Sequence, residues 1–125
     1  FEADTAGKDS WRHRKAGARQ VLVSSAIRSA HFVEHETTEP DLAQLLNRLL
    51  PCDLVLIEGF KREAVPKMEI FRAEVGKPYL YTEDKQIIAV ASDSAVLDCP
   101  LPVLDLNDIP KIADFVLQVV DLSSR

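Results

Sequence analysis

The sequence of 125 residues lacks the features of a membrane protein and of a disulfide-stabilised protein. No apolar run approaches the ~20 residues that cross a bilayer, and no segment has the pattern of a secretory signal peptide. The two cysteines, Cys52 and Cys99, are far apart and lack metal-ligand spacing, so we expect two reduced, partly buried thiols. These absences predict a cytoplasmic protein without a membrane partner.

An excess of positive charge is also missing. The formal net charge is -5, whereas surfaces that bind nucleic acid collect Lys and Arg around the phosphates. One basic cluster lies at residues 12–19, and the interpretation that we favour for it is a solvated helix face. We therefore expect no nucleic-acid partner.

Several catalytic signatures are absent as well. The sequence has no serine nucleophile elbow, no HExxH helix and no CxxC pair. Gly7-Lys8-Asp9-Ser10 echoes the end of a phosphate-binding loop. That loop needs a glycine where Glu2 stands and a Ser or Thr where Asp9 stands, so this segment is not a P-loop.

Methionine occurs once, at Met68, and the chain begins at Phe1 without a preceding strand. We therefore expect a piece of a longer protein. We also expect residues 1–125 to form one domain, although a partial one.

The most informative segment is DLVLIEGFKREAVPKMEIFR, residues 53–72. Its four consecutive aliphatic residues, 54–57, are typical of a strand that is buried on both faces in a parallel sheet. The run stops at Glu58 and Gly59. Because such sheets place their working groups beyond the carboxyl ends of the strands, these two residues are site candidates.

The remaining pattern indicates an α/β protein. We expect helices at residues 9–16, 37–50 and from 107 or 108 onward, with Thr38 as the candidate cap of the second helix. We expect strands at residues 20–24, 29–34, 53–57, 67–71, 79–81, 87–91 and 101–104, and we expect the first of them to be buried. The strands at 67–71 and 79–81 are expected to form a hairpin, and the apolar stripe of the second helix consists of Leu42, Leu45, Leu46, Leu49 and Leu50.

A carboxylate at the end of a buried strand can hold Mg²⁺ or orient water beside a phosphate, which is the chemistry we assign to Glu58. Gly59 would let the backbone approach a phosphate without a Cβ in the way. Asp93 follows the strand at 87–91, where it can accept hydrogen bonds from guanine or stabilise a turn, and we favour the turn. His31 and His35 are four residues apart, and we interpret them as exposed rather than as metal ligands.

Four segments give the chain a resemblance to a known family. EGFKREAVPKMEIFR (residues 58–72) is similar to the EGFKxxxxPKIExxR segment of the molybdopterin-guanine dinucleotide biosynthesis protein B family. GKDSWRHRKAGA (7–18), IAVASD (88–93) and LDLNDIPKIADFV (104–116) are similar to further segments of that family, in the same order.

The resemblance implies a P-loop NTPase-like fold, with a mostly parallel sheet, flanking helices and a small β-hairpin. It also implies that the first strand and the P-loop precede Phe1 and are missing from this chain. A sheet without that central strand exposes two unpaired edges.

The resemblance further implies a GTP-binding accessory protein of molybdenum cofactor biosynthesis, with weak GTP hydrolysis, Mg²⁺, a homodimer and a molybdopterin guanylyltransferase as partner. Glu58 and Gly59 match the Walker-B-like strand end, Lys61 matches the lysine of EGFK, and Asp93 matches the strand end where guanine would be selected. Whether the parent protein acts as an enzyme stays open, and these 125 residues alone are expected to be inactive. The alternatives are a docking adaptor that needs no turnover and a related P-loop metallochaperone.

Overall fold

The computed structural model describes residues 6–36 and 38–120 of the protein. The chain divides into two compact units, residues 1–49 and residues 50–125. The prediction that all 125 residues form one domain stays a prediction.

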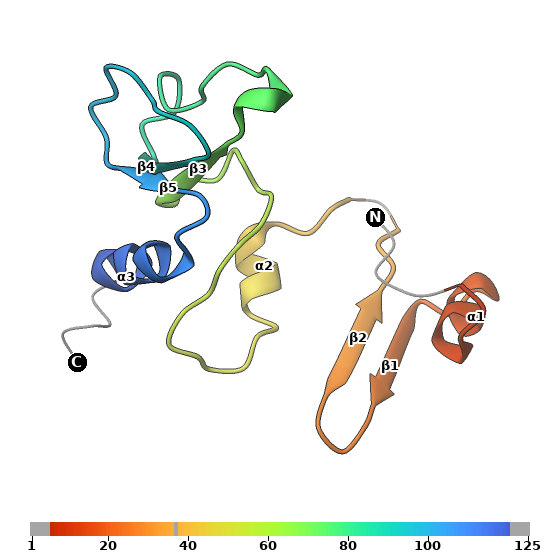
Figure 1. Cartoon of the computed structure of the whole chain (residues 1–125). Coiled ribbons are helices and arrows are strands. Elements are labelled where there is room, and N and C mark those ends of the chain that lie inside the picture. Colours follow the sequence, from red (N-terminus) through yellow and green to blue (C-terminus); the bar gives the residue numbers. More distant parts are fainter. Residues whose placement is uncertain (1–5, 37, 121–125) are drawn as a thin grey trace. The chain divides into compact units, whose positions relative to one another are not determined.

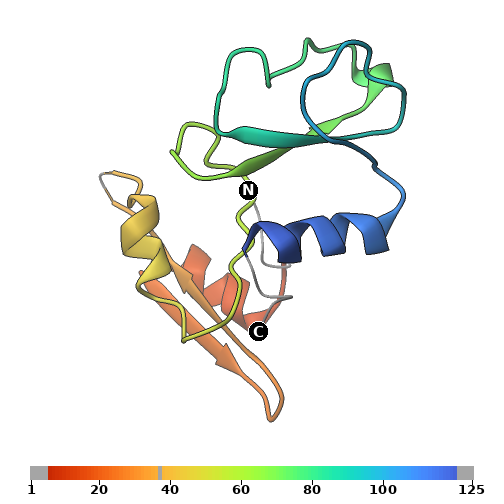
Figure 2. The same cartoon turned by 90° about the vertical axis from the view of Figure 1, so that its left-hand side faces the viewer.

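The first unit contains a short helix and an antiparallel hairpin (Figures 1 and 2). Helix α1 (Asp9–Lys15) ends before Gly17, close to the predicted boundary, and it contacts strand β1 (Gln20–Ser24). Strand β1 pairs with β2 (Ser29–Val33), with Leu22 opposite His31. The Ser25 hydroxyl accepts N–H groups from Ile27 and Arg28, which stabilises the turn between the strands.

Both strands of this hairpin occur where the sequence predicts them, but the prediction that residues 20–24 are buried is wrong. Leu22 is 71% exposed and Val23 is 44% exposed. A ribbon of two strands leaves much of its surface open to solvent, because it needs a third strand or a covering helix to form a core. The apolar composition of β1 indicated its strand conformation correctly and its burial incorrectly.

Helix α2 (Leu42–Leu46) is shorter than the predicted helix. Its N-cap is Asp41, not the expected Thr38, and Asp41 forms a capping box with Gln44. Of the five leucines in the predicted stripe, only Leu42 is buried, and Leu50 is 86% exposed. A short helix depends on an apolar neighbour for stability, and the described part of this unit buries only the first turn of α2.

The second unit is built on a parallel sheet of three strands. Strand β4 (Ile87–Ser92) lies between β3 (Lys67–Phe71) and β5 (Val103–Asp105). The strand predicted at residues 87–91 is confirmed, and its Ala89, Val90 and Ala91 side chains are completely buried, as expected for the centre of a parallel sheet.

The predicted hairpin of residues 67–71 and 79–81 is wrong. Residues 79–81 form no strand, and β3 pairs in parallel with β4 instead. The side chain of Glu69 provides the reason, because its two carboxylate oxygens accept the N–H groups of Leu80 and Tyr81, each at 2.8 Å. Those backbone groups therefore bond to a side chain rather than to a neighbouring strand.

The carboxyl-terminal elements agree with the sequence. Strand β5 begins two residues later than predicted, because Pro102 offers no N–H to a ladder, although its carbonyl accepts the Val90 N–H. Helix α3 (Ile109–Val119) begins after Asp108, which caps it by accepting the Lys111 N–H.

Helix α3 contacts β5 and lies on one side of the sheet, while the connection from β3 to β4 passes over the other side (Figures 1 and 2). That connection contains the short 3-10 helix η1 (Ala73–Val75). None of the helices formed by residues 6–36 and 38–120 is long and apolar enough to span a bilayer.

Candidate nucleotide-site residues

The segment before Glu58 differs from its prediction. Residues 53–57 form no strand, and Val55, Leu56 and Ile57 are 39%, 75% and 37% exposed. A strand requires ladder hydrogen bonds to a neighbour, and none of the described strands pairs with this segment. Glu58 is exposed. Its carboxylate is therefore available to a ligand, but it does not end a buried strand.

Glu58 is followed by a sharp turn with two residues in the left-handed region. Gly59 has φ 81° and Phe60 has φ 53°. A Cβ built on Gly59 would meet nothing within 4 Å, so the backbone dihedral requires glycine here and crowding does not. Phe60 carries a side chain in the same region, where only a minority of non-glycine residues occur.

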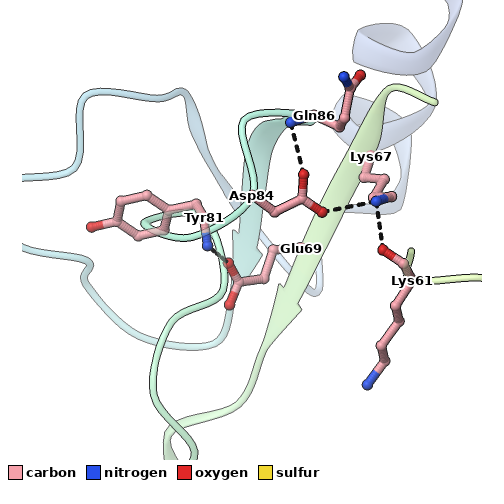
Figure 3. Close-up of polar contacts among 6 residues, drawn as sticks. All are labelled: Lys61, Lys67, Glu69, Tyr81, Asp84 and Gln86. Carbon is pink, nitrogen blue, oxygen red and sulfur yellow. Dashed lines mark hydrogen bonds and ion pairs between the residues drawn. The ribbon is translucent and has the colours of Figure 1, made fainter. Parts of the chain in front are cut away.

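Lys61 takes part in the structure through its carbonyl group. The carbonyl oxygen accepts a hydrogen bond of 2.6 Å from the ammonium group of Lys67, at the start of β3. Figure 3 shows that the Lys61 side chain points away from Lys67 and Asp84. Because Lys61 is exposed, its own ammonium group can reach an external anion.

Asp93 lies directly after β4 and stabilises a turn. Its Oδ1 atom accepts the N–H of Ala73 at 3.0 Å, and its own N–H bonds to the Phe71 carbonyl. The turn that it stabilises is the one after β3, contributed by a different segment of the chain. An interaction with guanine would have to share the carboxylate with this bond.

The structure does not bring the four candidates together. The Lys61 carbonyl is hydrogen-bonded to the side chain of Lys67, which is the first residue of β3. Asp93, in contrast, follows the carboxyl end of β4. Because β3 and β4 are parallel, the amino end of one and the carboxyl end of the other lie at opposite ends of the strands. Strand β3, which has five residues, is itself roughly 13 Å long. Glu58, Gly59 and Lys61 form one group, and Asp93 stands apart.

Sequence reasoning missed three polar residues that organise this unit, namely Lys67, Glu69 and Asp84. Lys67 forms an ion pair of 2.8 Å with Asp84, and this interaction lowers the pKa of the Asp84 carboxyl below its ordinary value. Glu69 is only 5% exposed. Two signals in the sequence could have indicated this carboxylate: a glutamate within an apolar strand, and the fixed glutamate of the EGFKxxxxPKIExxR segment at the same position.

Aromatic side chains gather beside Glu69. The rings of Phe71 and Tyr79 are 4.2 Å apart between centroids, and those of Tyr79 and Tyr81 are 5.5 Å apart. Burial raises the pKa of the Tyr81 phenol, and the neighbouring Cys99 thiol adds to the shift. Both cysteines are free, as predicted, although Cys52 is exposed rather than partly buried.

The two histidines that could suggest a metal site are exposed, in agreement with the sequence interpretation. The His31 ring lies 2.9 Å from the Gln20 side chain, across the β1–β2 hairpin. Among the residues that the structure describes, no group of three or more His, Cys, Asp or Glu side chains could hold a metal ion.

Comparison with known proteins identifies the family. The family model for molybdopterin guanine dinucleotide synthesis protein B matches residues 1–93, which is well over half of the chain. The chain belongs to this family. Its resemblance in the EGFK and GKDS segments is thereby confirmed.

Two curated relatives carry the name molybdopterin-guanine dinucleotide biosynthesis adapter protein. The protein from Haemophilus influenzae is 43% identical over 120 residues, which cover 93% of this chain and 65% of the relative. The protein from Escherichia coli K12 is 41% identical over 122 residues, which cover 94% of this chain and 69% of the relative. The chain thus spans about two thirds of the length of these relatives.

A solved structure shows the fold. The crystal structure of molybdopterin-guanine biosynthesis protein B aligns with a TM-score of 0.68 and 27% identity, and it covers 90% of this chain and 74% of the other. The fold class is therefore confirmed as α/β and P-loop NTPase-like, with a parallel sheet and a small antiparallel hairpin. The hairpin consists of β1 and β2 rather than of residues 67–81.

Proposed function

We propose that the intact protein containing this chain is a GTP-binding adapter in the synthesis of molybdopterin-guanine dinucleotide. The observation that carries the proposal is the family match over residues 1–93, together with two relatives above 40% identity that have this adapter name. The partner is the guanylyltransferase that attaches GMP to molybdopterin. The protein works in the cytoplasm as a homodimer.

The exposed group of Glu58, Gly59 and Lys61 faces the phosphates of GTP in this proposal. Mg²⁺ in nucleotide sites is typically held by one or two carboxylates together with phosphate oxygens, and the exposed carboxylate of Glu58 offers such a ligand. The exposed ammonium of Lys61 neutralises phosphate charge. Mg²⁺ supplies charge stabilisation when GTP is hydrolysed.

Asp93 contributes to guanine selection with its carboxylate, while Oδ1 keeps its bond to the Ala73 N–H. A carboxylate can accept several hydrogen bonds at once, so the two roles are chemically compatible. The base and the phosphates then contact different parts of the unit.

The test replaces Glu58 by Gln in the intact protein. We expect GTP hydrolysis to fall at least about tenfold, because a ligand to Mg²⁺ or its water is lost, while GTP affinity changes by less than about threefold. Glu83→Gln, at an exposed position, is the control and leaves both quantities unchanged. Failure of the wild-type protein to bind GTP would refute the proposal.

A docking adaptor that needs no turnover is the second candidate, and the adapter name of both relatives favours it. The same variant separates the two functions. If Glu58→Gln abolishes hydrolysis while molybdopterin-guanine dinucleotide is still formed at the normal rate, docking is the function and turnover is dispensable. If cofactor formation falls in proportion to hydrolysis, turnover is required.

A further inference from the structure

The ammonium group of Lys67 joins three segments of the second unit. It donates to the Lys61 carbonyl at 2.6 Å and to Asp84 Oδ2 at 2.8 Å (Figure 3). The side chain of Lys67 is only 18% exposed. A charge that is largely withdrawn from water needs such partners, so this lysine is a structural connection rather than a free surface cation.

The partner carboxylate of Lys67 is itself fixed. Asp84 Oδ1 accepts the Gln86 N–H at 2.9 Å, and the Asp84 carbonyl accepts the Ile87 N–H at the start of β4. The Lys67 N–H also bonds to the Gln86 carbonyl at 2.9 Å. Lys67 is therefore joined twice to the turn that leads into the buried central strand, by its ammonium group to the Asp84 side chain and by its main-chain N–H to the Gln86 carbonyl.

The Lys61 carbonyl, the other partner of the Lys67 ammonium group, belongs to a strained turn. Gly59 and Phe60 are consecutive residues with positive φ, and Lys61 follows them directly. Inside this turn, the Glu63 N–H donates to the Phe60 carbonyl at 3.1 Å. A non-glycine residue stays in the left-handed region only when its surroundings hold it there. The bond from Lys67 to the Lys61 carbonyl connects this turn to the sheet.

We infer that Lys67 is a positioning residue for nucleotide chemistry, which fixes the Lys61 carbonyl so that Glu58 and the Lys61 side chain stay directed outward. This inference rests on the proposed function, because it assigns a task to the same group of residues. A lysine suits the position because its ammonium provides three donors on a compact charge, enough for a carbonyl and a carboxylate together.

The first test measures the turn itself in the intact protein without nucleotide. In Lys67→Met, we expect the Glu63 amide hydrogen to exchange at least about tenfold faster, because loss of the tether lets the turn open locally. The amides of β4 should keep their protection, which shows that the sheet remains folded. Lys85→Met is the matched control, because Lys85 is exposed and adjacent to Asp84. Unchanged exchange at Glu63 in Lys67→Met would overturn the inference.

The second test separates positioning from a merely structural role. Lys67→Met should lower kcat for GTP hydrolysis at least about fivefold while KM changes by less than about twofold, because misplaced groups weaken the chemical step more than ground-state binding. Faster exchange at Glu63 with unchanged kcat would make Lys67 structural only and overturn the positioning role.

Asp84→Asn keeps the inference testable if Lys67→Met does not fold. The asparagine removes the charge that anchors Lys67 but leaves its bond to the Lys61 carbonyl possible, so exchange at Glu63 should increase about twofold to fivefold, which is less than in Lys67→Met. Exchange that equals the wild-type rate would contradict the inference. If the wild-type protein neither binds nor hydrolyses GTP, the proposed function fails, and the exchange measurements alone decide whether Lys67 holds the turn.

Discussion

Glu69 shows how a single residue can decide the path of a segment. It lies in β3 with an exposed fraction of 5%, yet both of its carboxylate oxygens accept backbone N–H groups, from Leu80 and Tyr81. Hydrogen bonds to an ionised acceptor are stronger than bonds between neutral groups, and they offset the cost of burial. Glu69 thus holds the connection from β3 to β4 over the sheet.

Replacing Glu69 by Gln should lower the free energy of unfolding by about 1–3 kcal/mol. The amide offers one acceptor oxygen, so one of the two N–H groups faces an NH₂ donor and remains unsatisfied. Urea denaturation of the wild type and the variant measures the difference. Glu74→Gln, at an exposed position in η1, is the control and should change stability by less than about 0.5 kcal/mol. Equal stability of Glu69→Gln and wild type would show that the two bonds contribute nothing.

The ion pair between Lys67 and Asp84 should make stability depend on pH in the acid range. The hydrogen bond from Lys67 lowers the pKa of Asp84 below its ordinary value of 3.8. The pair therefore contributes fully above that ordinary value, and its contribution is lost as the pH falls through the lowered pKa of the folded state.

We expect Asp84→Asn to be less stable than wild type at about pH 6 and to approach wild-type stability near about pH 2. Denaturant unfolding at several pH values between these limits gives the comparison. Asp53→Asn, whose side chain is exposed, should show no such convergence and is the control. A stability difference that stays constant over the whole range would argue against a charged interaction.

At the scale of the element, the sequence predicted what local signals determine. Helix α3 was located by its capping aspartate and its apolar face, and β4 by its aliphatic run. Both signals act within a few residues of the chain. The second helix was predicted over residues 37–50 but covers only Leu42–Leu46, because its extent depends on an apolar partner that the leucines alone do not provide.

The failures concern elements that need a distant neighbour. Residues 54–57 carry the same aliphatic signal as β4, but only β4 has strands on both sides. The expected hairpin at 67–81 failed because β4 takes the place beside β3 and Glu69 binds the returning backbone. Periodicity specifies that a segment favours a strand and does not specify which strand lies next to it.

The candidate site divides in the same way. Glu58, Gly59, Lys61 and Asp93 could be named from the family resemblance, because each occupies a position in a contiguous motif. Lys67 lies in the same motif as Lys61, but its partner Asp84 is 17 positions away and the two meet only in the folded unit, so their ion pair could not be predicted. Predicting that Asp93 lies apart from Lys61 would also have required knowing that β3 and β4 run parallel.

At the scale of the whole molecule, the second unit exposes apolar residues to solvent in two places. Strand β3 is an edge strand in the described sheet, and Ile70 within it is 58% exposed. The run at residues 54–57 is a further exposed apolar segment. Unpaired strand edges and contiguous apolar surface favour association with another chain. The 125-residue chain by itself should therefore associate.

We expect the isolated chain to sediment as a mixture of species above its monomer mass of 13.9 kDa, with a larger mean mass at higher protein concentration. Leu56→Lys should shift this distribution toward the monomer, because it places a charge at the centre of the exposed run, where the wild-type leucine is 75% exposed. Leu97→Lys is the matched control: Leu97 is 81% exposed but lies outside that run, so association should persist. Sedimentation velocity over a concentration series measures all three chains. A monomer at every concentration would show that the open apolar segment drives no association, and equal effects of the two substitutions would assign association to net charge rather than to residues 54–57.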